Sequence, residues 1–177
     1  VIRGFLFLLA GPMRNLQQAY LTLVRQAADY NILVRFSRYT SCGMAVIMLL
    51  VAWPCNTLVL GQVMGLDKAM RIYITWPLTA CALFPALYGT ANLLRGWFAG
   101  AHLTSRLGRS TFYKALLLLG SWPLIVIPQW PVPGIAIGIF LLLAAEFCEA
   151  CYLFIQRRRL LERHGLVPIG LRGVESS

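Results

Sequence analysis

Long apolar stretches, separated by short polar or basic segments, dominate the pattern of side chains along the chain. Four of these stretches run over 40–60, 72–96, 112–129 and 134–156. Each approaches the roughly 20 residues that a helix needs to cross about 30 Å of hydrocarbon. Prolines inside them are tolerated in membranes, where neighbouring helices and Ser or Thr side chains satisfy the freed carbonyls. The pattern predicts four membrane-spanning helices.

The opening stretch, residues 5–25, has a different pattern, because only one of its faces is apolar. Its apolar residues recur at steps of three and four, as on one side of a helix: Leu6, Leu9, Met13, Leu16, Tyr20 and Leu23. The polar side carries Arg14, Asn15, Gln18 and Thr22, which we call the polar stripe. Such a helix either lies in the membrane interface or crosses with its stripe turned to protein or water. We expect a fifth crossing.

Composition supports an integral membrane protein. Hydrophobic residues make up 59% of the 177 residues and charged ones 12%, against roughly 45–50% and about 25% in soluble domains. The mean hydropathy is +0.69, which leaves too little polar surface to cover a water-soluble particle. A chain this hydrophobic is also unlike disordered segments, which have low hydrophobicity. The predicted fold is an all-α polytopic helix bundle. It forms one transmembrane domain over 1–160, followed by a cytoplasmic tail over 161–177.

The net charge of +10 would in a soluble protein raise the possibility of nucleic-acid binding. Here the basic residues fall mostly between the apolar stretches, so we expect no nucleic-acid partner. Segments 25–38 and 95–114 and the C-terminal tail are rich in Lys and Arg, whereas 61–73 and 128–133 are poor. Because Lys and Arg favour cytoplasmic loops, this alternation predicts five crossings with the C-terminus inside and the N-terminus outside.

An outside N-terminus is normally set by an earlier helix. We therefore expect the five helices to be the last five of a longer transporter, or a subunit that relies on a partner membrane protein.

The stretch over 84–105, FPALYGTANLLRGWFAGAHLTS, carries a family resemblance. A proline-bearing helix leads into an Arg-Gly pair, a turn of small residues and a basic approach to the next helix. This resembles the tenth-to-eleventh helix region of the MOP flippase superfamily, which includes MATE exporters, lipid-linked oligosaccharide flippases and progressive-ankylosis-like exporters. The proline-rich turn over 128–133, the last helix and the basic tail are similar to the end of those chains.

The resemblance implies a fold and a function. The five helices would be helices 8–12 of a twelve-helix transporter built from two lobes, and the N-terminal lobe would be the partner that the chain lacks. The expected activity is export of an amphipathic or anionic substrate, a small molecule or a lipid-linked one, by alternating access. The expected location is the inner (plasma) membrane of a bacterium, in contact with membrane lipids.

The polar stripe is the leading candidate for the substrate path. An Arg at membrane depth costs on the order of 3 kcal/mol on insertion scales, so Arg14 should face a partner or an aqueous cavity. The resemblance implies that this helix borders the central cavity, where a guanidinium would bind an anionic group through its planar fork. Alternatively, Arg14 extends to the head groups and the stripe serves helix packing.

Glu146 and Glu149 are the only carboxylates inside the four apolar stretches, and their spacing of three puts them on one helix face. A buried carboxylate could couple proton movement to transport. The structural alternative, which we favour, is that the two pair with Arg95 or Lys114 near the same inner boundary. Arg95 itself is best explained as an anchor at the end of its helix.

No motif for catalysis, a metal or a phosphate-binding loop occurs in the sequence. We expect no catalytic residue, no metal site and no cofactor. Besides a transporter, the sequence is compatible with a non-transporting membrane subunit or assembly scaffold, whose polar stripe would bind a partner helix.

Overall fold

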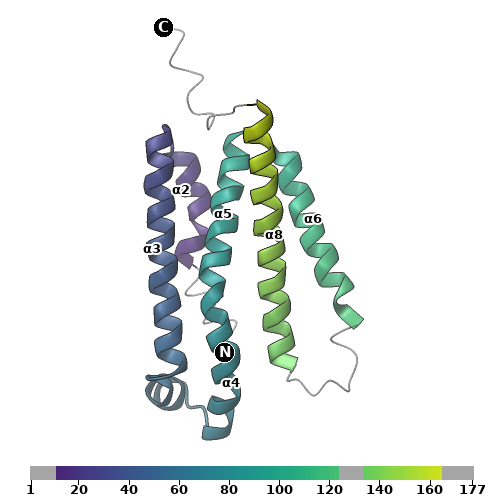
Figure 1. Ribbon diagram of the computed structural model, residues 1–177. Helices are drawn as coiled ribbons and strands as arrows, with labels where there is room; N and C mark the ends of the chain where they lie inside the picture. Colours follow the sequence, from purple (N-terminus) through teal and green to yellow (C-terminus); the bar gives the residue numbers. More distant parts are fainter. Residues whose placement is uncertain (1–10, 124–133, 165–177) are drawn as a thin grey trace.

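The computed structural model describes residues 11–123 and 134–164, and all of their regular structure is helical, as the sequence predicts (Figure 1). The elements are α2 (Leu16–Leu23), α3 (Ala27–Ala52), the π-helix η1 (Thr57–Val63), α4 (Lys68–Ala80), the 3₁₀ turn η2 (Cys81–Leu83), α5 (Phe84–Gly100), α6 (Thr104–Gly120) and α8 (Gly134–His164). The parts of the predicted elements that fall on 5–10, 124–133 and 165–177 lie outside the described residues.

Three helices are long and apolar enough to cross a membrane within the described ranges: Ala28–Ala52, Lys68–Gly100 and Gly134–Glu162. They correspond to the predicted crossings over 40–60, 72–96 and 134–156. The first and fourth predicted crossings, 5–25 and 112–129, each extend into segments that the structure does not describe. Their described parts are residues 11–23 and the helix α6. Five crossings therefore stay a prediction.

Helix α3 begins well before residue 40, so the prediction of a basic loop over 25–38 is wrong. Its start is fixed by a capping box, in which the Asp29 carboxylate accepts from the backbone N–H of Gln26 at 2.9 Å. The chain reverses within residues 24–26, between α2 and α3. Arg35 and Arg38 are consequently helical residues, although sequence reasoning placed them in a loop.

Helix α3 also ends earlier than predicted, at Ala52 rather than near residue 60. Pro54 has no backbone N–H to donate to Leu50, and the Leu50 carbonyl instead accepts from Cys55 at 2.8 Å. The chain then continues as the wider π-helix η1. The missing N–H of Pro54 thus ends the α-helix several residues before the predicted boundary.

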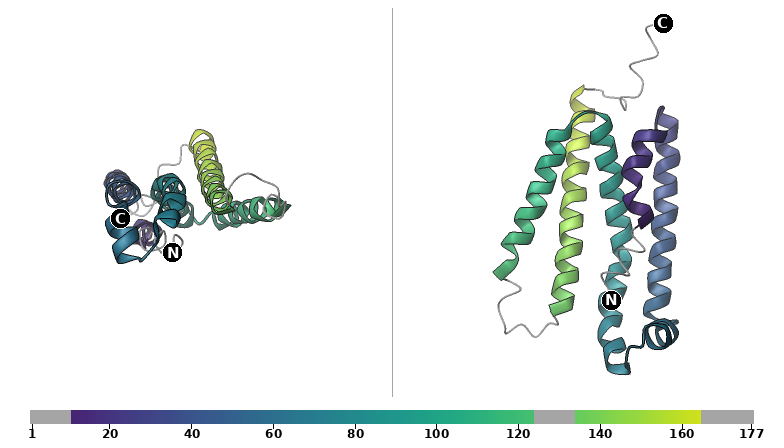
Figure 2. Two further views of the ribbon diagram at one scale, coloured as in Figure 1. Left: turned by 90° about the horizontal axis from the view of Figure 1, so that it is seen from below. Right: turned by 180° about the vertical axis from the view of Figure 1, so that it is seen from behind.

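Helices α4 and α5 form one nearly continuous rod across the bundle. The Asp67 carboxylate caps its start by accepting from the Met70 N–H at 2.8 Å. The 3₁₀ turn η2 comes just before Pro85, which lacks the N–H of a regular α-helical turn. The rod brings α5 into the centre of the structure, between α2 and α3 on one side and α8 on the other (Figure 2).

Close packing of α2 on α5 depends on small residues of α5. A Cβ atom placed on Gly96 would lie 2.6 Å from the Cβ of Tyr20, and one on Gly100 would lie 3.1 Å from its ring. The Gly96-xxx-Gly100 spacing therefore allows the two helices to approach, as in other small-xxx-small contacts. Gly134 and Gly138 have the same spacing, but a Cβ atom placed on either would meet no atom of another described residue within 4 Å, so no close helix contact is seen there.

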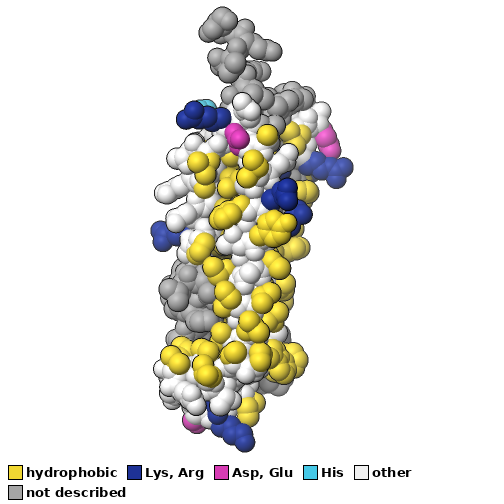
Figure 3. Space-filling view, turned by 90° about the vertical axis from the view of Figure 1, so that its left-hand side faces the viewer, with side chains coloured by type: hydrophobic (Ala, Val, Ile, Leu, Met, Phe, Trp, Pro, Cys, Tyr) yellow, Lys and Arg dark blue, Asp and Glu magenta, His cyan; other side chains and the backbone are white. Residues whose placement is uncertain are grey.

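Large apolar side chains cover much of the outer surface. On α8, Phe140, Phe147 and Phe154 are 69%, 56% and 55% exposed. Figure 3 shows a similar apolar surface on the side of the molecule that contains α3, with Lys and Arg in its upper half and at its lower tip. Such a surface would be an aggregation hazard in water, but it is what lipid chains require.

The turn from α5 to α6 places a non-glycine residue in the left-handed region. His102 has φ 54°, and its N–H donates to the Ala99 carbonyl while the Leu103 N–H donates to the Phe98 carbonyl. This is the Schellman arrangement, in which glycine is the usual residue.

We expect His102→Gly to stabilise the fold by about 1 kcal/mol, measured as a higher unfolding temperature in detergent. A lower temperature than wild type would contradict this reading of the turn.

Candidate functional site

Four charged side chains from three helices meet inside the bundle. Glu149 of α8 accepts from the Nε and Nη2 atoms of Arg95 on α5, at 2.7 and 2.5 Å. Its other oxygen lies 3.1 Å from the Nζ of Lys114 on α6. Lys114 also contacts Glu146 at 2.5 Å. We call Arg95, Lys114, Glu146 and Glu149 the charge cluster.

The charge cluster is deeply buried and balanced. The side chains of Glu149 and Glu146 are 0% and 4% exposed, and those of Arg95 and Lys114 are 22% and 19% exposed. Two cations face two carboxylates, so the net charge is zero. Neutrality matters because an unpaired charge removed from water costs several kcal/mol.

Asn92 extends the charge cluster toward the start of the described chain. This residue is 3% exposed, and its Oδ1 accepts from the Nη1 of Arg95 at 3.2 Å. Its Nδ2 donates to the backbone carbonyl of Met13 at 3.3 Å. The hydrogen bonds thus link residues 11–14, α5, α6 and α8 in one network.

One carboxylate oxygen of the charge cluster has no partner. Both oxygens of Glu149 accept hydrogen bonds, but Oε2 of Glu146 is buried without one in the structure. A buried acceptor without a donor costs free energy, so Oε2 of Glu146 is the least well satisfied atom of the charge cluster. Counting 1.5 Å per residue from Gly134, it lies about 18 Å along α8.

The pairing of both carboxylates with Arg95 and Lys114 is the arrangement that the structural alternative predicts. The contacts explain why two acidic residues are tolerated in an apolar helix. Coupling of ion movement to transport by Glu146 or Glu149 stays a prediction. Arg95 is a core residue of the network rather than only a helix-end anchor.

The polar stripe faces away from the bundle. Arg14, Asn15, Gln18 and Thr22 are all exposed, whereas Met13, Leu16 and Tyr20 on the other side are buried. The Thr22 hydroxyl donates to the Gln18 carbonyl at 3.0 Å, and so its polar group is satisfied within the helix. Among the described residues, no hydrogen bond or ion pair joins a side chain of the polar stripe to the charge cluster.

No protein-family model, curated protein or solved structure matches this chain. The site is therefore interpreted from its own geometry. Among the described residues, no group of three His, Cys, Asp or Glu side chains is arranged to hold a metal ion.

Sequence reasoning missed three polar residues that the structure places in the interior or in a groove. Asn92 was detectable as a polar residue inside an apolar stretch, three positions before Arg95. Arg38 falls in the predicted basic loop and Arg157 one residue beyond the predicted helix 134–156, but they lie on α3 and α8 and line a groove. Only the observed lengths of these two helices show that both arginines line the same groove.

Proposed function

We propose that this chain is the C-terminal lobe of a MOP-type secondary transporter or flippase, which moves an amphipathic or anionic substrate by alternating access. The proposal includes an N-terminal lobe as its partner and a bacterial inner membrane with the C-terminus in the cytoplasm. The resemblance of residues 84–105 supports the family. The turns at 24–26 and 101–103 lie at the same end of the bundle as the C-terminal end of α8, which supports the orientation.

The outward-facing polar stripe is the observation that carries this proposal. The buried apolar side of residues 13–20 leaves Arg14, just before α2, and Gln18 and Thr22 on α2 exposed. In a membrane, such a row is costly against lipid and favourable against a water-filled cavity. A guanidinium there is suited to an anionic group, because it donates two parallel hydrogen bonds to a phosphate or carboxylate.

The proposal is tested by transport measurements on the protein expressed from the complete reading frame that contains this sequence. In proteoliposomes, fluorescent phosphatidylglycerol is the probe, and its movement between leaflets is followed by chemical quenching. We expect Arg14→Gln to slow this movement about tenfold, since one charge-assisted contact is lost. Arg109→Gln is the matched control, because Arg109 is an exposed arginine on α6. Equal rates for the two variants would remove the stripe from the path.

The same stripe also favours the second candidate function, a scaffold that binds a partner helix. A photo-crosslinking amino acid at Gln18, introduced in native membranes, separates the two. Crosslinks to lipid, substrate or an N-terminal lobe of the same protein support the transporter. Crosslinks to one unrelated membrane protein, together with no movement of the lipid probe, support the scaffold.

A further inference from the structure

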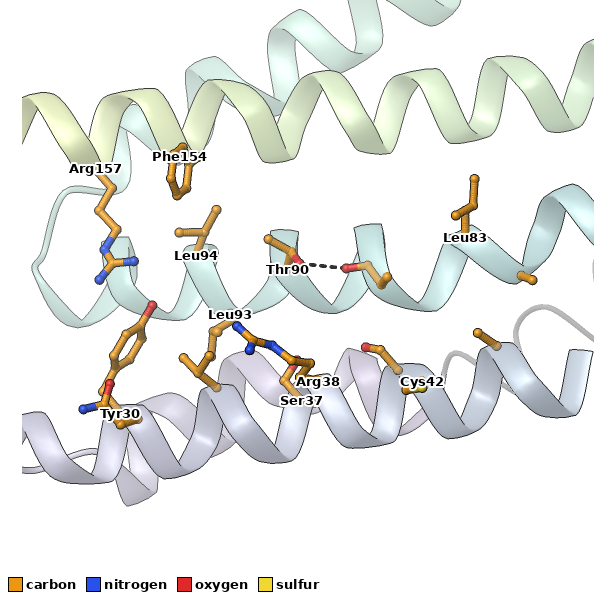
Figure 4. Close-up of a pocket in the computed structure, with 16 residues that line it drawn as sticks. Tyr30, Ser37, Arg38, Cys42, Leu83, Thr90, Leu93, Leu94, Phe154 and Arg157 are labelled. Carbon is orange, nitrogen blue, oxygen red and sulfur yellow. Dashed lines mark hydrogen bonds between the residues drawn. The ribbon is translucent and has the colours of Figure 1, made fainter.

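A groove of about 610 Å³ opens between α3 and α8, and α5 forms its floor (Figure 4). Its lining comes from α3, η2, α5 and α8 and includes no residue of α2. The groove is therefore separate from the polar stripe, and its volume falls within the range of small-molecule sites.

Two cations and no carboxylate line this groove. Arg157 enters from α8 and Arg38 from α3, and the Arg38 side chain extends along the groove toward the end where Arg157 lies (Figure 4). Within the described residues, no carboxylate lies within 4.0 Å of either guanidinium. The groove therefore has a positive charge that nothing in its own lining balances.

Arg157 is held in place by aromatic rings. Its guanidinium carbon lies 4.9 Å from the ring centre of Tyr30 and 5.7 Å from that of Trp97. Its Nε is buried and makes no hydrogen bond. The contacts with both rings restrain the guanidinium at this end of the groove.

The groove changes from charged to apolar along its length. Tyr30 and Arg157 mark the end near the C-terminal end of α8, and Ala45, Ala82 and Leu83 mark the other end. Tyr30 and Ala45 are about 22 Å apart along α3, at 1.5 Å per residue. The charged end is thus nearer the membrane surface and the apolar end is deeper.

We infer that the groove binds an anionic phospholipid from the leaflet at the C-terminal end of α8. The arginines Arg157 and Arg38 bind the phosphate, and an acyl chain lies along the apolar part toward Leu83. The groove and an anionic phospholipid match in charge and in depth, because the lipid carries its phosphate at the membrane surface and its acyl chains below it. A partner helix would instead have to supply an acidic residue opposite each arginine.

The experiment measures which lipid the purified protein retains. The protein from the complete reading frame is equilibrated in detergent with equal amounts of phosphatidylglycerol and phosphatidylcholine that have identical chains. Native mass spectrometry then counts the bound lipids. We expect phosphatidylglycerol to be preferred, and Arg38→Gln to weaken its retention about tenfold.

Matched variants make the result decisive. Arg35→Gln removes the same charge one turn earlier on α3, from an exposed residue outside the groove lining, and should leave retention unchanged. Ala86→Phe fills the apolar part and should reduce retention of both lipids. Arg157→Gln should resemble Arg38→Gln; if it fails to fold, because Arg157 packs on Tyr30 and Trp97, Arg38→Gln still decides.

Three outcomes would overturn the inference. The first is equal retention of the two lipids by the unmodified protein. The second is identical behaviour of Arg38→Gln and Arg35→Gln. The third is a protein helix captured by a photo-crosslinker at Cys42, an exposed residue of the groove lining, in native membranes. No residue of α2 lines the groove, so the two proposals rest on different residues. If the groove does not bind lipid, the transport proposal still stands, and if the transport proposal fails, the lipid-binding inference still stands.

Discussion

Glu149→Gln should destabilise the protein by about 3–5 kcal/mol, the largest effect that we expect from one substitution. Glu149 is the carboxylate shared by Arg95 and Lys114, and its side chain is fully buried. Glutamine keeps the shape but removes the negative charge, so two partly buried cations are left with Glu146 alone. Unfolding in detergent against a denaturant, followed by circular dichroism, measures the loss.

An exposed pair on the same helix supplies the control for Glu149. Glu162 contacts Arg158 at 2.8 Å with 61% and 75% of their side chains exposed. Glu162→Gln should change the unfolding free energy by less than about 0.5 kcal/mol, as for other surface i,i+4 pairs. Equal losses at positions 149 and 162 would mean that the charge cluster contributes no more than a surface contact.

A double substitution tests whether charge balance is the cause. Lys114→Met with Glu146→Gln removes one charge of each sign and leaves Arg95 paired with Glu149. The double variant should be more stable than Lys114→Met alone, because the single variant leaves the Glu146 carboxylate buried without its only partner. A double variant as unstable as the sum of the two singles would contradict a coupled network.

The charge cluster was largely predictable from the sequence, and the reason is physical. Charges inside an apolar helix must pair, and few opposite charges lie at the same depth. Once Glu146 and Glu149 are placed on α8, Arg95 and Lys114 are the nearest candidates. The spacing alone does not specify that Glu149 is shared, nor that Asn92 connects the cluster to Met13. Those details depend on how the helices pack.

The helix boundaries were less predictable, because basic residues favour a loop there while helix capping favours a helix. Arg35 and Arg38 look like loop residues by charge, yet their long side chains allow the head groups to be reached from a helix. The capping box at Gln26 and Asp29 was the local signal for an earlier start. The groove depends on these lengths, since Arg38 and Arg157 line it from helical positions on α3 and α8.

Gly96→Ala should also have a large effect, through steric conflict rather than charge. The new Cβ would lie 2.6 Å from the Cβ of Tyr20, and 3.3 Å from the backbone oxygen of Gln17. A Cβ cannot rotate away, so α2 itself must shift from α5. The conflict should cost about 1–3 kcal/mol, which outweighs the roughly 1 kcal/mol that alanine gains over glycine in a helix.

Two other glycines separate this conflict from general effects of alanine. A Cβ at Gly108, on α6, would meet nothing within 4 Å, so Gly108→Ala should be neutral or slightly stabilising. At Gly89 the nearest atom is the Met13 sulfur at 2.9 Å, the far end of a flexible side chain, so Gly89→Ala should be intermediate. The same detergent unfolding measurement ranks the three. If Gly96→Ala unfolds like Gly108→Ala, the contact of α2 with α5 is looser than described.

The Gly96 variant also connects packing with the proposed transport path. It alters no polar residue, yet it displaces α2, which carries Gln18 and Thr22 on its exposed side and follows directly after Arg14 and Asn15. Under the transporter proposal, Gly96→Ala should slow movement of the fluorescent phosphatidylglycerol, whereas Gly108→Ala should leave the rate unchanged. A Gly96→Ala protein that is destabilised but transports at the normal rate would show that the position of the polar stripe is unimportant for the path.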